Sequence, residues 1–207
     1  TFAVVAGAIG ASLSPGIIMI LGFANLLGDG VSMSLGNYLS TKSESEYKDA
    51  ERAREAWEAE NIPEGEKEEL RQIYAEKGFR GPLLEQVVDV LTSDKEKWVD
   101  TMMLEELNIV HEYKSPTKGA FATFASFVGI GIIPLLAFVL SFLNQSLSGV
   151  DFQISLVFTA LAIFIAGSAR SLVTGKRWFL AGVEMSIVGA IAAGAAYTVG
   201  LLLRNVI

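Results

Sequence analysis

The sequence predicts an all-α membrane protein with five transmembrane helices and a cytoplasmic helical domain inserted between the second and the third. Two observations support this fold class. Thirty-two of the 39 charged residues fall between positions 42 and 118. The rest of the 207-residue chain is apolar enough to bring the whole to 51% hydrophobic residues and a mean hydropathy of +0.44. A charged segment has therefore been inserted into an otherwise membrane-like sequence.

Four apolar stretches are long enough to cross a bilayer, because a helix needs roughly 20 apolar residues to span the hydrocarbon core. A polar break at 144–151 divides the long stretch that begins at Gly119 into two spans. The four predicted spans are 16–41, 119–143, 152–170 and 178–203. The domains are accordingly 1–41, the charged segment 42–118, and 119–207.

Residues 1–13 are apolar but too short to span, since thirteen helical residues reach roughly 20 Å against a core of about 30 Å. They lack the basic start of a signal peptide. We expect them to be the second half of a first transmembrane helix. The missing half, with an acidic residue, is expected upstream of Thr1.

Charge and composition set the orientation and exclude several classes of function. The chain has no cysteine, which excludes disulfides and thiolate metal sites. A net charge of −7 without a basic patch argues against nucleic-acid binding. Basic residues keep short loops cytoplasmic. Arg170, Lys176 and Arg177 lie between the last two spans, and Lys42 and Lys118 flank the charged segment, which predicts that both regions are cytoplasmic.

Four polar or sulfur-bearing residues lie four positions apart in the first complete span: Asn25, Asp29, Met33 and Asn37. This spacing places them on one face of a helix. A charged aspartate inside a membrane costs roughly 2.5–3.5 kcal/mol on insertion scales, so it usually marks an ion or proton path. The alternative is a cluster of hydrogen bonds between helices, with Met33 as packing. We favour a translocation path that passes along this stripe.

Glu184 is the isolated acid of the last span. Two interpretations stay open at this point: a place on the ion path, or a salt bridge to Arg170, Lys176 or Arg177. Small residues at four-residue spacing between Ala181 and Gly194 let helix backbones approach closely. They favour a tightly packed bundle and are compatible with a homodimer.

The charged segment divides into short helices. The helix of the preceding span is expected to continue past Lys42 and to stop at Asn61, and Pro63 suits the first turn of the next helix. That helix is predicted to run to about Lys77. A short amphipathic helix follows at 83–91, and a capping box with Ser93 at the N-cap precedes a further helix.

Glutamates repeat at i,i+3 spacing on two of these helices, as Glu55 with Glu58 and Glu66 with Glu69. Charged helices usually present a solvated face. Two such pairs on helices joined by a tight turn could instead bring four carboxylates together, which requires protons or cations between them. Carboxylates with one or two methionine sulfurs suit Fe²⁺, Mn²⁺ or Zn²⁺.

Enzyme functions find little support. A di-iron oxidase in a helix bundle uses two Glu-x-x-His motifs, and the chain has a single histidine, His111. It also has no Gly-Lys-Ser/Thr sequence for nucleotide phosphates. We predict that the protein is not an enzyme and needs no catalytic cofactor.

Three segments resemble the vacuolar iron transporter family. Gly30-Val-Ser-Met-Ser-Leu-Gly-Asn-Tyr-Leu-Ser-Thr-Lys-Ser-Glu44 is similar to that family's second-helix signature. Trp98-Val-Asp-Thr-Met-Met-Leu-Glu-Glu106 is similar to its Trp…Met-Met…Glu segment, and Phe2-Ala-Val-Val-Ala-Gly7 to the end of its first helix. The similarity covers nearly the whole chain in the same order.

The resemblance implies five transmembrane helices, a homodimer and proton-coupled export of Fe²⁺ from the cytosol. It also implies a cytoplasmic domain that binds divalent metal ions. Carried over residue by residue, the methionine of the path falls on Met33, and the metal ligands of the domain fall on Glu55, Glu58, Glu66, Glu69, Glu106, Met102 and Met103.

Two departures from the family pattern are notable. The Asp-Gly of the family's first helix would lie just before Thr1, and the second-helix acid of plant members corresponds to Asn25, whereas here the acid is Asp29. Plant members act at the vacuole. The Gly-Asn-Tyr-Leu sequence is more typical of prokaryotic members, which would place the protein in a cell membrane, with the vacuolar membrane expected if the source is eukaryotic.

The sequence thus predicts a proton-coupled Fe²⁺ exporter with membrane lipid, protons, divalent ions and a second copy of the chain as partners. One alternative is a Mn²⁺ transporter of the same mechanism. The other is a membrane-anchored metal buffer or sensor that transports nothing. An acid inside the bilayer favours transport, because a buffer has no need of one.

Overall fold

The structure, a computed structural model, describes residues 1–110, 112, 114–143 and 150–204. The described residues form helices joined by turns and contain no strand, so the all-α prediction is confirmed. They divide into two compact units, which are described separately below. The apolar unit comprises residues 1–37 and 120–207, and the acidic unit comprises residues 38–119.

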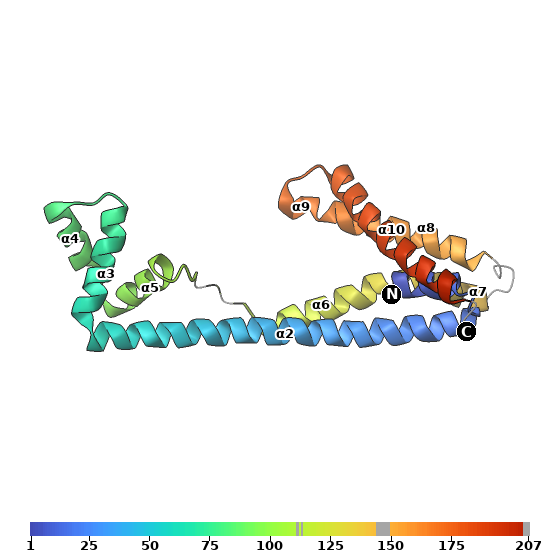
Figure 1. Ribbon diagram of the computed structural model, residues 1–207, viewed down its shortest axis with the longest axis horizontal. Coiled ribbons are helices and arrows are strands. Elements are labelled where there is room, and N and C mark those ends of the chain that lie inside the picture. Colours follow the sequence, from blue (N-terminus) through green and yellow to red (C-terminus); the bar gives the residue numbers. More distant parts are fainter. Residues whose placement is uncertain (111, 113, 144–149, 205–207) are drawn as a thin grey trace. The chain divides into compact units, whose positions relative to one another are not determined.

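Helix α2 contributes residues to both units, because it runs without a break over Pro15–Asn61. The expectation that the first complete span continues past Lys42 is therefore confirmed. Its first half is apolar and its second half is highly charged, which matches the change in composition along the chain. The apolar unit is completed by α1 (Phe2–Gly10), most of α6 (Pro116–Gly131), α7 (Ile133–Leu143), α8 (Asp151–Ala169), α9 (Ser171–Thr174) and α10 (Trp178–Leu203), which Figure 1 labels.

Three stretches in the described part of the chain are long and apolar enough to cross a membrane: α2, residues 151–174, and α10. A fourth is added if α6 and α7 form one span. The predicted spans at 152–170 and 178–203 match α8 and α10 closely. The polar break at 144–151 lies largely outside the described residues. The count of five spans stays a prediction.

The predicted span 119–143 is not one straight helix, because α6 and α7 meet at a bend of 46°. Pro134, the second residue of α7, explains the bend. Proline cannot donate the helical hydrogen bond, and its ring clashes with the carbonyl of the residue four positions earlier. That residue is Ile130, in the last turn of α6. The proline was visible in the sequence, but the bend was not predicted.

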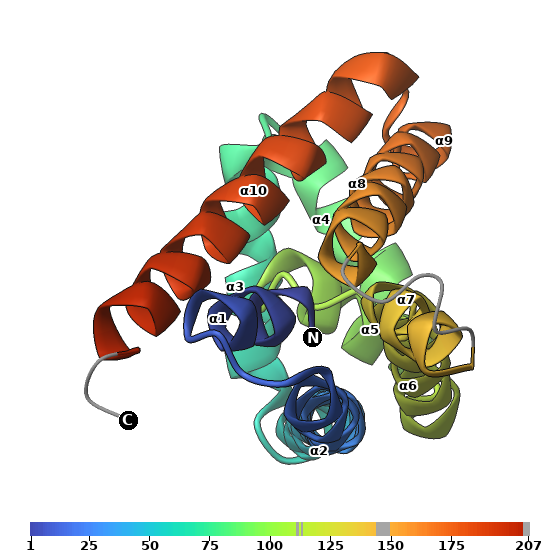
Figure 2. The same ribbon diagram turned by 90° about the vertical axis from the view of Figure 1, so that its right-hand side faces the viewer.

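Helix α10 packs against α1 and against α8 (Figure 2). The contact with α1 depends on glycine. A Cβ added at Gly200 would lie 2.0 Å from the Gly7 carbonyl oxygen, and one at Gly10 would lie 2.3 Å from the Tyr197 carbonyl oxygen. No side chain fits at these distances. Within the predicted small-residue pattern, Gly182 approaches α8 in the same way, since a Cβ there would lie 2.6 Å from Ser168 Oγ. Part of that pattern therefore serves packing within the chain. A buried apolar cluster of α1, α2 and α7 completes the core of this unit, with Val5, Leu26, Leu135 and Phe138 among its members.

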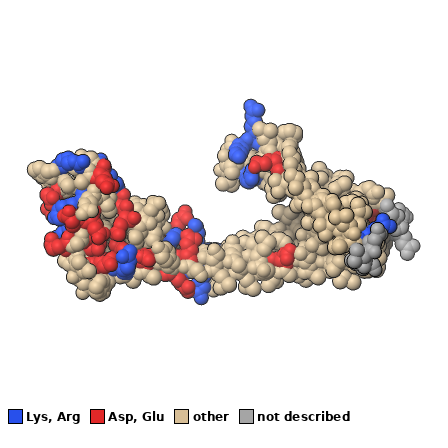
Figure 3. Space-filling view, viewed as in Figure 1, with Lys and Arg blue, Asp and Glu red and all other residues tan. Residues whose placement is uncertain are grey.

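The acidic unit surrounds a small core of its own. The last turns of α2 pack with α3 (Pro63–Glu76), α4 (Gly81–Thr92) and α5 (Lys95–Glu105). Ala59, Leu70, Val88, Trp98 and Met102 are buried together. Charged side chains cover these helices, whereas the visible face of the apolar unit carries few (Figure 3). The core holds the helices in place and leaves the charged faces to the surface and to the site described next.

The predicted helix boundaries of the acidic unit hold to within two residues, with one error in capping. Pro63 is the first residue of α3, as predicted. The N-cap of α5 is Asp94, not Ser93, and its carboxylate accepts a hydrogen bond from the Lys97 amide at 3.1 Å. Ser93 instead closes α4 and donates to the Val90 carbonyl. Aspartate caps a helix as well as serine does, and the sequence offered both at adjacent positions.

Candidate metal centre

The turn between α2 and α3 brings two pairs of glutamates to face each other. Helix α2 ends at Asn61, and α3 begins two residues later with Pro63, whose fixed φ suits the first helical turn. Glu55 and Glu58 stand one turn apart at the end of α2, and Glu66 and Glu69 stand one turn apart at the start of α3. Helical geometry places each pair on one face, so the reversal of the chain brings both faces together.

Five carboxylates gather in this unit and form two overlapping groups. Glu55, Glu58 and Glu66 each offer an oxygen within 4.8 Å of the others, and Glu66, Glu69 and Glu106 do the same. Glu66 belongs to both groups. Glu106 comes from the C-terminal cap of α5. The structure thus brings together all five glutamates named from the sequence. We call the first group the inner triad and the second the outer triad.

The two triads differ in accessibility. Glu55 is 1% exposed and Glu66 is 5% exposed, whereas Glu69 and Glu106 are exposed. Both oxygens of Glu55, and Oε2 of Glu66, are buried without a hydrogen-bond partner among the described residues. Glu55 Oε1 does have an ion-pair partner, an Arg54 nitrogen at 3.0 Å. A buried polar oxygen without a partner is unfavourable, and a buried charge more so. A bound cation would supply the missing partner, so these residues fit a divalent metal ion.

The environment raises the pKa of three of the carboxyls. Burial raises the pKa of Glu55 to about 7, helped by the charge of Glu106 and opposed by the Arg54 guanidinium. Burial likewise raises the pKa of Glu66 to about 7, with Glu69 and then Glu55 adding to the effect. The pKa of Glu106 rises for the same two reasons, burial first and then the charge of Glu69. Near neutral pH the centre therefore holds protons that a divalent ion would displace.

One guanidinium lies against the inner triad. Arg54 places one terminal nitrogen 3.0 Å from Glu55 Oε1 and the other 3.3 Å from Glu58 Oε2, while its Nε donates to Glu51 at 2.9 Å. The sequence analysis did not identify this residue. The signal was present, because an arginine three or four positions from a glutamate on a helix lies next to it.

The outer triad opens on a small cavity. Glu69 and Glu106 line it together with Gln72, Ile73 and Glu76, and its volume is about 230 Å³. The cavity is large enough for a hydrated ion and carries a further carboxylate at its rim. Glu69 and Glu106 are therefore accessible from this cavity.

The two predicted methionine ligands are buried on α5. Met102 is 1% exposed and Met103 is 4% exposed. Met102 belongs to the apolar core, where it packs with Leu70 and Trp98. Thioethers fill irregular gaps in cores well. A packing role is thus established for Met102, and metal ligation by either sulfur stays a prediction.

In the apolar unit, the polar stripe of α2 forms one close contact. The Asn25 side chain donates a hydrogen bond to Asp29 Oδ2 at 2.6 Å, and Asp29 is exposed within this chain. Met33, one turn further, is 52% exposed, and Asn37 is also exposed. The structure therefore joins Asn25 to Asp29. That these two residues line a translocation path together with Met33 and Asn37 stays a prediction.

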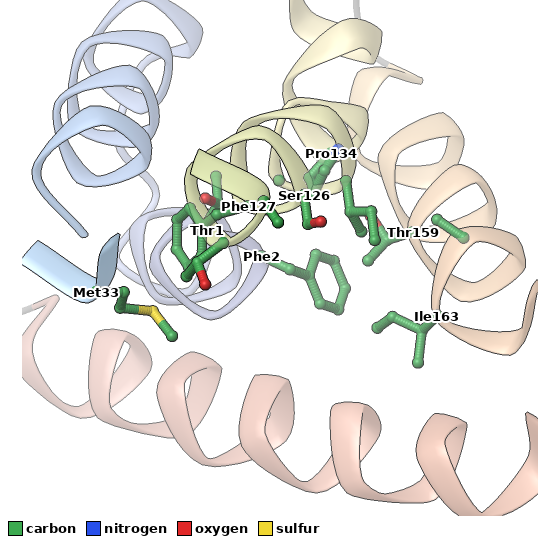
Figure 4. A pocket seen from close by; sticks show the side chains of 13 residues that line it. Thr1, Phe2, Met33, Ser126, Phe127, Pro134, Thr159 and Ile163 are labelled. Carbon is green, nitrogen blue, oxygen red and sulfur yellow. The ribbon is translucent and has the colours of Figure 1, made fainter. Parts of the chain in front are cut away.

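Met33 reaches a larger cavity of about 610 Å³ within the apolar unit (Figure 4). Thr1, Phe2, Ser126, Phe127, Pro134, Thr159 and Ile163 also line it. Most of this lining is apolar, and Ser126 and Thr159 were not predicted from the sequence. Hydroxyl residues are hard to select in an apolar helix, because they also bond to the backbone of their own helix. Thr159 does so, donating to the Ser155 carbonyl at 2.7 Å.

Two further acids of the apolar unit have partners. Glu184 accepts a hydrogen bond from Arg170 at 2.7 Å. The salt bridge offered as one interpretation of this residue is therefore present. The buried Asp151 accepts a hydrogen bond from Ser141 at 2.9 Å and begins α8. A negative charge is stabilised at the start of a helix. A role of Glu184 on the ion path stays a prediction, because its ion pair with Arg170 neither supports nor contradicts that role. The single histidine, His111, lies outside the described residues.

Comparisons with known proteins identify the family. The family model described as "VIT family" matches residues 1–201. The chain belongs to the VIT family. Its members are transporters rather than enzymes, which confirms the prediction that the protein is not an enzyme. Together with the membrane-competent helices, membership makes the chain an integral membrane protein.

Several relatives of the chain in this family match along nearly its whole length. A protein named vacuolar iron transporter from Toxoplasma gondii is 35% identical over all of this chain and 70% of its own length. One of the same name from Plasmodium berghei is 33% identical over 99% of this chain and 77% of its own length. Vacuolar iron transporter 1 of Arabidopsis thaliana is 33% identical over 99% of this chain and 80% of its own length.

Proposed function

We propose that this VIT family protein is a proton-coupled transporter that exports Fe²⁺ from the cytosol. The acidic unit, on the cytoplasmic side, captures the ion at its carboxylates, and Asp29 and Met33 pass it through the apolar unit. A homodimer is the proposed working form. The relatives from Toxoplasma, Plasmodium and Arabidopsis, each named for vacuolar iron transport, support iron as the cargo.

The observation that carries the proposal is the pair of overlapping carboxylate triads. Five glutamates converge from α2, α3 and the end of α5, and the buried Oε2 atoms of Glu55 and Glu66 have no hydrogen-bond or ion-pair partner among the described residues. A surface acidic patch would leave its carboxylates in water. This centre instead buries two of them, which is favourable only with a proton or a cation present. Carboxylate oxygens suit Fe²⁺ and Mn²⁺.

Transport, as distinct from storage, is supported by the acid of α2. Asp29 lies in a helix that is apolar and long enough to span a membrane. An acid in such a helix is costly and usually serves an ion or proton route. Asp29 and Glu184 are the proposed coupling groups, since a carboxylate that releases a metal ion can take up a proton in its place.

Mn²⁺ is the second candidate cargo, because carboxylate oxygens do not separate it sharply from Fe²⁺. A metal buffer or sensor without transport is the third candidate. Flux across a sealed bilayer distinguishes the buffer from both transporters, whereas binding to the acidic unit does not.

Reconstitution into liposomes tests the proposal. Fe²⁺ uptake under anaerobic conditions, and Mn²⁺ uptake in parallel, would be followed with and without an imposed pH gradient. We expect saturable uptake that the gradient stimulates, while protein-free liposomes show none. Saturable binding without any flux would establish the buffer instead. A flux that is the same with and without the pH gradient would exclude proton coupling.

A further inference from the structure

The inner triad contains a cation supplied by the chain itself. Arg54 contacts Glu55 and Glu58, which are two of the three residues of that triad, at 3.0 and 3.3 Å. Glu51 holds the same guanidinium from the previous turn at 2.9 Å. The Arg54 side chain is 45% exposed, so it covers the triad from the solvent side without being locked into the core.

We propose that Arg54 is a built-in competitor for the inner triad: its guanidinium neutralises Glu55 and Glu58 until a divalent ion displaces it. This inference rests on the proposed role of the triads in metal capture. It adds a residue whose ion pairs lower the affinity of the inner triad directly. Lower affinity at the inner triad favours release of the captured ion, which a transporter needs and a storage protein does not.

Two physical effects oppose metal binding while Arg54 stays in place. The carboxylate oxygens that face the guanidinium are engaged in ion pairs, so a metal ion gains them only as those pairs break. A divalent ion beside Glu55 and Glu58 is also repelled by the positive charge of Arg54. The ion pairs concern the inner triad, because Arg54 pairs with Glu55 and Glu58 and, among the described residues, with neither Glu69 nor Glu106 of the outer triad. Its charge also reaches Glu106, where it opposes the rise of the pKa, so the repulsion extends to the outer triad, whereas the ion pairs do not.

Arg71 provides a matched control on the neighbouring helix. It pairs with Glu68 at 3.1 Å and with Glu85 at 3.0 Å, neither of which belongs to a triad. Its side chain is partly exposed, as that of Arg54 is. Removing its charge changes the net charge of the acidic unit by the same amount. Comparing the two variants therefore separates the effect of a direct contact with the triad from the effect of a change in net charge.

The test is a Mn²⁺ titration of the full chain in detergent at pH 8, with free Mn²⁺ read from its electron paramagnetic resonance signal. We expect Arg54→Gln to tighten binding roughly fivefold, which corresponds to one partly exposed ion pair. Arg54→Lys keeps the charge and should stay within about twofold of wild type. Arg71→Gln should do the same. The gain in Arg54→Gln should shrink as salt is raised, because these partly exposed charges are screened.

Glu106→Gln assigns the effect to one triad, since it removes a carboxylate of the outer triad and leaves all three carboxylates of the inner triad in place. The gain from Arg54→Gln should persist in that background, and its loss there would overturn the assignment to the inner triad. Unchanged or weaker binding in Arg54→Gln itself would show that Arg54 positions the ligands or is irrelevant to them. Either result overturns the inference and leaves the proposed capture site standing. Absence of saturable binding in wild type would overturn both.

Discussion

The acids of the acidic unit and those of the apolar unit have opposite kinds of partners. In the acidic unit the glutamates of the triads face one another, and burial raises the pKa of Glu55 and Glu66 to about 7. In the apolar unit each acid has one partner that is not an acid: Asn25 for Asp29, and Arg170 for Glu184. Among the described residues, the five carboxylates of the triads pair with one guanidinium, that of Arg54, so they need further protons or cations. Asp29 and Glu184 each already have a partner of their own.

This difference suggests a division of labour. Converging carboxylates bind a divalent ion strongly and suit capture at low concentration. A single carboxylate bonded to a neutral amide binds weakly and suits passage, because an ion held too firmly would not move on.

The largest effect is expected from removing the triad charges. Changing Glu55, Glu58, Glu66 and Glu69 together to glutamine should abolish saturable Mn²⁺ binding to the full chain, measured by titration in detergent. The metal-free protein should also become more stable. One glutamate whose pKa rises from 4.5 to about 7 on folding destabilises the protein at pH 8 by on the order of 3 kcal/mol.

Changing Glu64, Glu68, Glu85 and Glu96 to glutamine provides the control for this variant. It removes the same number of charges from the acidic unit outside the triads. Binding that survives the first set of changes, or is lost equally in both, would contradict the assignment.

A strong pH dependence of metal binding is the second expectation. Glu55 and Glu66 must both lose their protons to ligate one ion, and both have a pKa of about 7. Affinity should therefore fall roughly 100-fold between pH 8 and pH 6. Titration at a series of pH values checks this. A flat profile would mean that these two carboxyls do not ligate the ion.

Stability without metal should have the opposite pH dependence. A carboxyl whose pKa is higher in the folded state than in the unfolded state binds more protons when folded between pH 4.5 and 7. This contribution to stability is present below about pH 4.5 and is lost as the pH rises through 7. Denaturant melts of the metal-free protein measure it.

A smaller effect is expected from changing Met33, whose thioether belongs to the polar stripe of α2. Met33→Leu keeps the bulk of the side chain and removes its sulfur, so Fe²⁺ flux should fall by less than about tenfold. Selectivity should shift towards Mn²⁺, which prefers oxygen ligands. Competition between the two ions in liposomes measures the shift. An unchanged ratio would leave Met33 as a packing residue of its cavity.

The smallest effect should come from the pair of Arg170 and Glu184. Both side chains are about half exposed, and such pairs contribute roughly 0–1 kcal/mol. Glu184→Gln should therefore change thermal stability little. If this variant loses the stimulation of flux by a pH gradient while it stays folded, Glu184 takes part in coupling. Retained stimulation would leave the ion pair as its whole role.

The sequence predicted most reliably what depends on local geometry. The i,i+3 pairs on α2 and α3 follow from helical periodicity, and the turn between them follows from Pro63. The structure places those glutamates together. Glu106 was named only through the family resemblance, because its approach to Glu69 depends on how α5 folds back. The bend at Pro134 and the contacts of Arg54 were visible as patterns but not recognised. The N-cap at Asp94 was misplaced by one residue, since two good capping residues stand side by side.

The central claim is that capture and passage use different acids, and Asp29→Asn tests it most directly. This substitution keeps the shape and the hydrogen-bonding capacity of the side chain, and it removes the charge and the titratable proton. A charge in a membrane helix is costly, so the variant should fold at least as well as wild type. Mn²⁺ binding in detergent and proton-driven Fe²⁺ flux in liposomes would be measured on one preparation. We expect wild-type binding with flux reduced to background, and flux at the wild-type rate would show that Asp29 is not needed for passage.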